Sequence, residues 1–138
     1  MIKEIPPPQA WEILNSDKEA VLLDVRTKME FDYVGHPVGA IHVPWQEAPT
    51  WEITPAFVDK VREVLKEARP GAKALEDLKI LTLCRSGKRS YAAGQALADS
   101  GFKHVININE GFEGEIDKSK HRGNISGWRF HKLPWEQT

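Results

Sequence analysis

The sequence contains a single cysteine, Cys84, among its 138 residues. One cysteine excludes an internal disulfide and offers no thiolate cluster to a metal ion. The five histidines lack the close pairing that is typical of zinc ligands, so neither a metal nor another cofactor is expected. The chain also lacks a surplus of positive charge: its net charge of -1 argues against general binding to nucleic acid.

Long hydrophobic runs are missing as well. No stretch approaches the roughly 20 apolar residues needed to span a bilayer, and the N-terminal segment has no apolar run of signal-peptide length. We therefore expect a cytoplasmic protein that does not bind membranes, or a periplasmic one if a leader has been removed. The length and the 41% hydrophobic fraction fit one soluble domain over residues 1–138, expected as a monomer because no interface pattern stands out.

Short apolar runs alternate with helical patterns, and this alternation predicts an α/β fold with a mostly parallel sheet. Strands are expected at residues 20–25, 39–43, 78–83 and 104–108. Helices are expected at residues 9–14, 54–66 and 86–100, with Thr54 as the N-cap of the second. The tail over residues 127–135 has no clear period, and we expect it to pack against the domain as a strap.

Cys84 directly follows the clearest of these predicted strands. It should therefore lie at the carboxyl edge of the sheet, where open α/β folds place their ligand sites. Gly87 allows a tight turn, and the helix that follows would direct its free N–H groups toward the sulfur. Arg85, Lys88 and Arg89 add positive charge nearby. Such surroundings favour a thiolate, which is the nucleophilic form of cysteine, and would also stabilise a persulfide anion.

The alternative is that Cys84 is an ordinary packing residue. Cysteine is among the most buried residue types, and a lone cysteine at a strand end most often serves the core. The glycine-containing loop and its three basic residues favour the reactive interpretation.

Several further motifs occur in a fixed order around this loop. A buried run ends in Asp24-x-Arg26, and a Gly35-His36 pair precedes Gly39-Ala40-Ile41-His42-Val43-Pro44. The loop itself has cysteine first, glycine fourth and a basic residue sixth, and a strand with a glycine turn follows at residues 105–112. Together these motifs resemble the single-domain sulfurtransferases of the rhodanese family, which include thiosulfate sulfurtransferases, over nearly the whole chain.

The resemblance implies a three-layer domain whose central, mostly parallel five-stranded sheet is flanked by helices on both faces. It implies that Cys84 forms the persulfide and that the active-site loop comprises Arg85, Ser86, Gly87, Lys88 and Arg89. Arg85 and Arg89 are the expected anion-binding side chains, whereas Lys88 either shares this role or faces solvent. Asp24 and Arg26 resemble a supporting pair behind the loop, with pairing of Arg26 to Glu30 as an alternative.

The implied activity moves sulfane sulfur from thiosulfate or a related persulfide donor to cyanide or a thiol, such as that of a thioredoxin-like protein. A sulfur carrier or docking module without enzymatic activity is the first alternative. A cysteine-dependent phosphatase is another, but the phosphatase signature places five residues between cysteine and arginine, and only four separate Cys84 from Arg89. Arsenate reduction would need an external thiol, because no second cysteine is present.

Two further segments can each be interpreted in two ways, and the first is longer than in a minimal domain of this family. Residues 45–77 are longer than needed, and their Trp45, Glu47, Trp51 and Glu52 either form a rim beside the site or pack; packing is favoured. The tail segment with His121-Arg122-Gly123-Asn124 and Trp128 either lines the entrance or covers the core.

Overall fold

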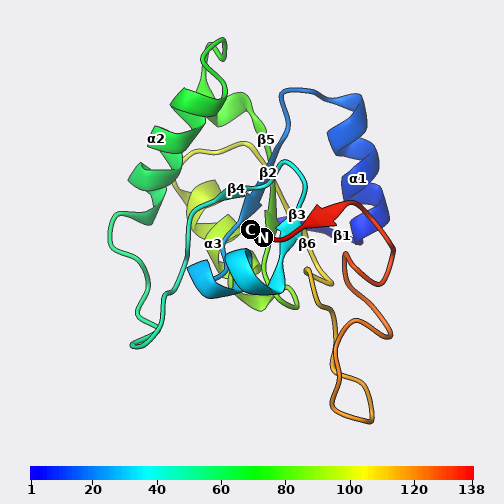
Figure 1. Cartoon of the computed structure of the whole chain (residues 1–138). Coiled ribbons are helices and arrows are strands. Elements are labelled where there is room, and N and C mark those ends of the chain that lie inside the picture. The colour runs from blue at the N-terminus through cyan, green and yellow to red at the C-terminus, as the bar shows by residue number, and fades with distance from the viewer.

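A parallel five-stranded sheet forms the centre of the computed structural model, which describes residues 1–138 (Figure 1). Its strands follow the order β1-β6-β5-β2-β4, and every neighbouring pair is parallel. Their bounds are β1 Lys3–Ile5, β2 Val21–Asp24, β4 Ile41–His42, β5 Lys79–Leu83 and β6 His104–Ile108. The predicted α/β fold is confirmed.

Helices cover both faces of this sheet, as the predicted three-layer arrangement requires (Figure 1). Helix α1 (Pro7–Ser16) lies on one face, and α2 (Phe57–Ala68) and α3 (Lys88–Asp99) lie on the other. Because side chains alternate across a strand, Leu22 contributes to the core under α1 while Val21 and Leu23 pack toward α2 and α3. Two short helices, η1 (Glu30–Val34) and η2 (Leu75–Asp77), lie in the connections.

The sequence prediction missed the edge strand β1. Only Ile5 of its three residues is buried, so no alternating pattern marks it, and its pairing with β6 depends on tertiary packing. The strand predicted at residues 39–43 forms only over β4, at the other edge of the sheet.

Helix boundaries also differ from the prediction. Thr54 is not an N-cap: α2 begins at Phe57, and the residue that precedes the helix is Ala56, whose φ of 55° lies outside the right-handed helical region. Helix α1 is longer than the predicted 9–14 span at both ends. Helix α3 begins at Lys88 instead of Ser86, since the intervening residues form the loop after β5.

The C-terminal tail packs across the domain, as predicted. Trp128 is fully buried and meets the ring of Trp11 edge-on, with 6.0 Å between ring centroids. Further along, β7 (Trp135–Glu136) pairs antiparallel with β3 (His36–Pro37), a two-stranded ribbon that the sequence did not predict. None of the helices has the length and apolar character needed to cross a membrane.

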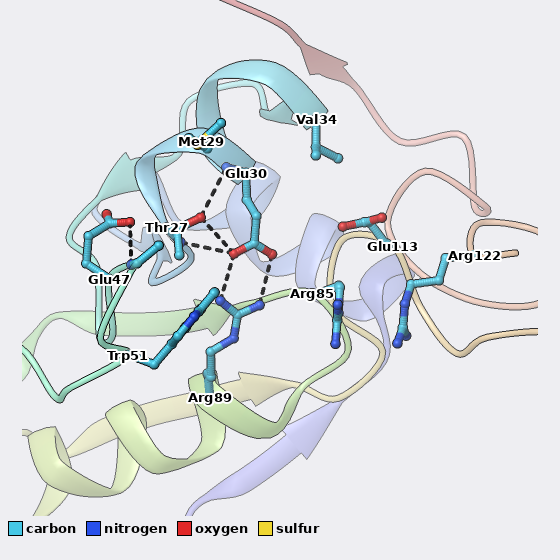
Figure 2. Close-up of a pocket in the computed structure, with 11 residues that line it drawn as sticks. Thr27, Met29, Glu30, Val34, Glu47, Trp51, Arg85, Arg89, Glu113 and Arg122 are labelled. Atoms are coloured by element: carbon cyan, nitrogen blue, oxygen red, sulfur yellow. Dashed lines mark hydrogen bonds and ion pairs between the residues drawn. The ribbon is translucent and has the colours of Figure 1, made fainter. Parts of the chain in front are cut away.

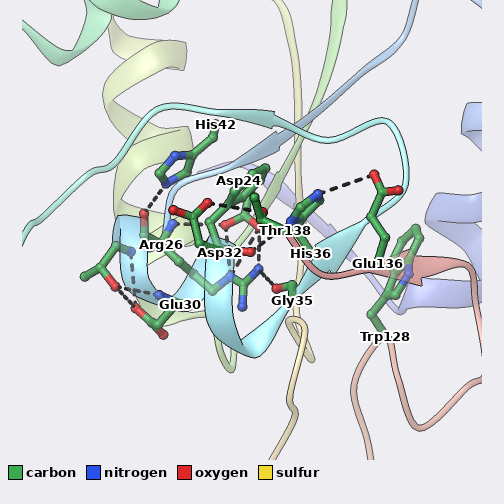
Figure 3. Close-up of polar contacts among 12 residues, drawn as sticks. Asp24, Arg26, Glu30, Asp32, Gly35, His36, His42, Trp128, Glu136 and Thr138 are labelled. Atoms are coloured by element: carbon green, nitrogen blue, oxygen red, sulfur yellow. Dashed lines mark hydrogen bonds and ion pairs between the residues drawn. The ribbon is translucent and has the colours of Figure 1, made fainter.

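A buried ion pair joins Asp24, at the end of β2, to Arg26. The Arg26 Nε lies 3.0 Å from Asp24 Oδ1 and its Nη2 lies 2.6 Å from Oδ2, and neither side chain is exposed (Figure 3). The same Nη2 donates to the Gly35 carbonyl at 2.7 Å. Arg26 thus pairs with Asp24 and not with Glu30, and it fixes the end of η1 to the sheet.

We predict that Asp24→Ala lowers the free energy of unfolding by about 3–5 kcal/mol, because it leaves the Arg26 charge buried without a partner. The double variant Asp24→Ala/Arg26→Met removes both charges and should recover part of this loss. Urea unfolding of the three proteins measures both effects. A cost below about 1 kcal/mol for the single variant would contradict a structural role for the pair.

Candidate active site

Cys84 lies directly after β5 and is almost fully buried, with 1% of its surface exposed. Its Sγ accepts hydrogen bonds from the Gly87 backbone N–H at 3.1 Å and from the Ser90 hydroxyl at 3.2 Å. Ser90 belongs to the first turn of α3, so the sulfur sits at the N-terminal end of that helix, where its dipole favours negative charge. These contacts suit a thiolate or a persulfide anion.

The first two carbonyl groups of the loop accept hydrogen bonds from the turn that follows β6. The Phe112 N–H donates to the Cys84 carbonyl at 2.8 Å, and the Glu113 and Gly114 N–H groups donate to the Arg85 carbonyl, each at 3.0 Å. Each peptide unit is planar and trans, so fixing a carbonyl on one side directs the following N–H to the other. The turn after β6 therefore orients the amides of the cysteine loop.

Gly87 is required for the shape of this loop. Its φ of 108° lies in the left-handed region that disfavours side chains, and an added Cβ would collide with the Asn109 carbonyl. The Gly87 carbonyl accepts a hydrogen bond from Asn107 Nδ2 at 3.0 Å, and Asn107 Oδ1 accepts one from the Thr82 hydroxyl at 3.1 Å. This buried polar chain ties the loop to β5 and β6.

Ser90 and Asn107 were missed as site residues by the sequence analysis. Asn107 carried a signal, since it is an amide within an otherwise apolar strand and a buried amide needs partners. Ser90 lies six residues after Cys84, and only the turn at Gly87 brings its hydroxyl back to the sulfur.

A cavity of about 650 Å³ lies beside the loop (Figure 2). Arg85 and Arg89 line it, whereas Cys84 is buried and is not among the lining residues. Lys88 is exposed and faces a separate shallow depression near Tyr91, so the structure places it in solvent and apart from the other two cations. Ser86 lines that depression as well. No group of three or more potential metal-ligating side chains occurs.

Arg89 forms an ion pair with Glu30, and both residues line the cavity. Two parallel hydrogen bonds, of 2.7 and 2.9 Å, join the guanidinium to the carboxylate (Figure 2). Burial alone would raise the pKa of Glu30, but Arg89 and hydrogen bonds from Thr27 outweigh it and lower that pKa to about 2. The positive charge of Arg89 is therefore largely compensated within the protein, and its role as an anion-binding residue stays a prediction.

The long connection between β4 and α2 contributes one residue to the core and others to the lining of the cavity. The ring of Trp45 meets Phe57 edge-on at 5.0 Å and belongs to the core, as the favoured interpretation had it. Glu47 and Trp51 instead line the cavity, where Trp51 lies 5.8 Å from the Arg89 guanidinium, and exposed Glu52 does neither. From the tail, Arg122 also reaches the cavity wall.

The Glu30–Arg89 pair predicts a pH dependence of stability. A carboxylate whose pKa falls from 4.5 to about 2 on folding stabilises the protein above about pH 4.5 and loses this contribution as the pH falls toward 2. The difference in unfolding free energy between the wild type and Glu30→Gln should therefore be constant above about pH 5 and shrink below it. Urea unfolding at a series of pH values tests this. Exposed Glu12→Gln in α1 is the control and should show no such trend; a parallel trend in both variants would refute the assignment.

Comparison with known proteins identifies the family. The sequence model of the rhodanese-like domain family matches residues 7–116. The thiosulfate sulfurtransferase GlpE of Haemophilus influenzae is 31% identical over 112 residues, which cover 81% of this chain and 86% of GlpE. An uncharacterized protein of Rickettsia prowazekii, RP600, is 30% identical over 139 residues, which cover 99% of this chain and 98% of RP600.

A solved structure agrees with these matches. The crystal structure of Rv0390 from M. tuberculosis superposes with a TM-score of 0.83 and 32% sequence identity, covering 99% of this chain and 98% of that one. The similarity to Rv0390 in sequence and in fold thus extends along nearly the whole length of both chains. The chain belongs to the rhodanese family.

Proposed function

We propose that this protein is a sulfurtransferase that carries sulfane sulfur as a persulfide on Cys84. The observation that carries the proposal is the pair of hydrogen bonds, from the Gly87 N–H and the Ser90 hydroxyl, that converge on a buried Sγ at the start of α3. Both donors are preorganised in the folded protein, so they stabilise charge on sulfur without reorganisation during the reaction.

The donor step we propose uses thiosulfate or a related persulfide. The Cys84 thiolate attacks the outer sulfur of thiosulfate, an S–S bond forms on Cys84, and the original S–S bond breaks as sulfite leaves with the electron pair. Charge is conserved, since a thiolate and a dianion become a persulfide anion and sulfite. Arg85, which forms no ion pair within the protein, provides positive charge for the approaching anion.

In the second half of the cycle, cyanide or a thiolate attacks the terminal sulfur of the persulfide. The Cys84–sulfur bond breaks and the thiolate is regenerated, with thiocyanate or a new persulfide as product. A thiol of a thioredoxin-like protein is the macromolecular acceptor that we propose. A non-enzymatic sulfur carrier would accept sulfur from a partner protein much faster than from thiosulfate, which separates the two functions.

The first test is the mass of the intact protein after incubation with thiosulfate. We expect the wild type to gain one sulfur atom, about 32 Da, that reductant removes, and Cys84→Ser to gain nothing. If the wild type gains no sulfur from thiosulfate, organic persulfides are the next donors to test. Absence of a gain from every donor would refute the proposed function.

Ser90→Ala tests the second hydrogen bond to the sulfur. Loss of one donor to a charged sulfur should slow persulfide formation by on the order of ten-fold, because such bonds contribute more than neutral ones. The rate of persulfide formation is obtained by quenching the reaction with thiosulfate at a series of times and measuring the mass of the intact protein. Exposed Ser119→Ala, in the tail, is the matched control and should react at the wild-type rate; an unchanged rate for Ser90→Ala would remove this hydroxyl from the mechanism.

A further inference from the structure

The cavity beside the cysteine loop is larger than thiosulfate requires. Its volume of about 650 Å³ lies within the range that accommodates organic ligands, whereas thiosulfate has only five atoms. Met29 and Val34 contribute apolar side chains on the η1 side of the cavity and Trp51 lies beside Arg89, while Arg85 and Arg122 lie side by side in another part of the wall (Figure 2). Such a wall suits a carbon skeleton with a charged end more than a small inorganic anion.

Two of the three arginines that line this cavity have no carboxylate partner. Arg89 is bound by Glu30, but Arg85 and Arg122 form no ion pair. The nearby carboxylate of Glu113 lies 3.9 Å from Arg129 and not within ion-pair distance of either. An anion that enters the cavity would therefore find the uncompensated positive charge at Arg85 and Arg122.

The backbone of Gly114 holds these two arginines together. Arg122 Nη1 donates to the Gly114 carbonyl at 2.7 Å, while the Gly114 N–H donates to the Arg85 carbonyl at 3.0 Å. One peptide segment thus positions the Arg122 guanidinium relative to the cysteine loop. The remaining N–H groups of Arg122 make no hydrogen bond to the protein and are available to a ligand.

The loop that carries Arg122 is itself well ordered by hydrogen bonds. Asp117 Oδ1 accepts from the N–H groups of Ser119 and His121 at 2.9 and 2.8 Å, and its Oδ2 accepts from Asn124 Nδ2 at 2.8 Å. This loop projects from the sheet in orange in Figure 1 and lies beyond residues 7–116, which the family model matches. Arg122 therefore lies outside the part of the chain that the family model matches.

We propose that Arg122, together with Arg85, binds the carboxylate of an organic persulfide donor and thereby determines donor specificity. This inference rests on the proposed sulfur transfer through Cys84. The Cys84 thiolate attacks the outer sulfur of R–S–SH, the new S–S bond forms on Cys84, and R–S⁻ leaves with the electron pair of the broken bond. The proton stays on the transferred sulfur, and no oxidant or reductant is consumed. The carboxylate of R rests on the two guanidinium groups during this exchange.

The test compares two donors that differ only at the end distant from sulfur, the persulfides of 3-mercaptopropionate and 2-mercaptoethanol. We expect Arg122→Gln to lower kcat/KM about 5- to 20-fold for the carboxylate donor, mainly through KM, and less than about two-fold for the neutral donor. Arg122→Lys keeps the charge and should recover part of the loss. Lys118→Gln removes a charge from the same loop outside the cavity and should match the wild type.

Equal effects of Arg122→Gln on both donors, or no effect on either, would overturn the subsite while leaving the Cys84 chemistry intact. Thermal unfolding of each variant shows whether the fold is retained.

A binding measurement separates the subsite from the chemistry. The unreactive thioether 3-(methylthio)propionate, titrated into Cys84→Ser by calorimetry, should bind more weakly by the same 5- to 20-fold factor when Arg122→Gln is added. If the wild type accepts sulfur neither from these persulfides nor from thiosulfate, the proposed function fails, and this titration still shows whether Arg122 binds the carboxylate. Equal affinity with and without Arg122 would overturn the inference.

Discussion

The active site depends on the hydrogen bonds that the turn after β6 makes to the carbonyl groups of the cysteine loop. The N–H groups of residues 112–114 hold the carbonyls of Cys84 and Arg85, and this fixes the loop amides on the opposite side. Gly111 permits the close approach, since a Cβ at this position would collide with the backbone of Arg85. The parallel pairing of β5 with β6 places the two turns side by side, so the sheet itself brings cysteine and cradle together.

The charges around the site are arranged in two different ways. Asp24 with Arg26, and Glu30 with Arg89, are paired within the protein and fix the position of η1 beside the loop. Arg85 and Arg122 are unpaired at the cavity wall. Paired charges in a partly buried setting give rigidity, whereas unpaired cations in a concave surface attract an anion. A count of basic residues near Cys84 therefore overstates how many of them are free to bind substrate.

Long apolar segments of the fold were predictable, and short ones were not. The runs at β2, β5 and β6 are buried on both faces, and continuous apolar sequence reports this directly. Strands β1, β3 and β7 have three residues or fewer and no alternation, and they exist because a neighbouring strand or the tail offers backbone partners. The predicted start of α2 was wrong because Ala56 adopts a positive φ, so the helix begins only at Phe57.

By itself, the sequence determined the parallel α/β arrangement, the family, and the position of Cys84 between a buried strand and a helix. These features depend on hydrophobic patterning and on short-range turn chemistry, which neighbouring residues specify. Only the tertiary structure decided which cations remain free. Arg89 finds Glu30 59 residues away, and Arg122 reaches the cavity through Gly114. Ser90 and Asn107 likewise acquire their roles from contacts at Cys84 and Gly87. Charge compensation and polar pairing over such separations arise from packing, and no local pattern encodes them.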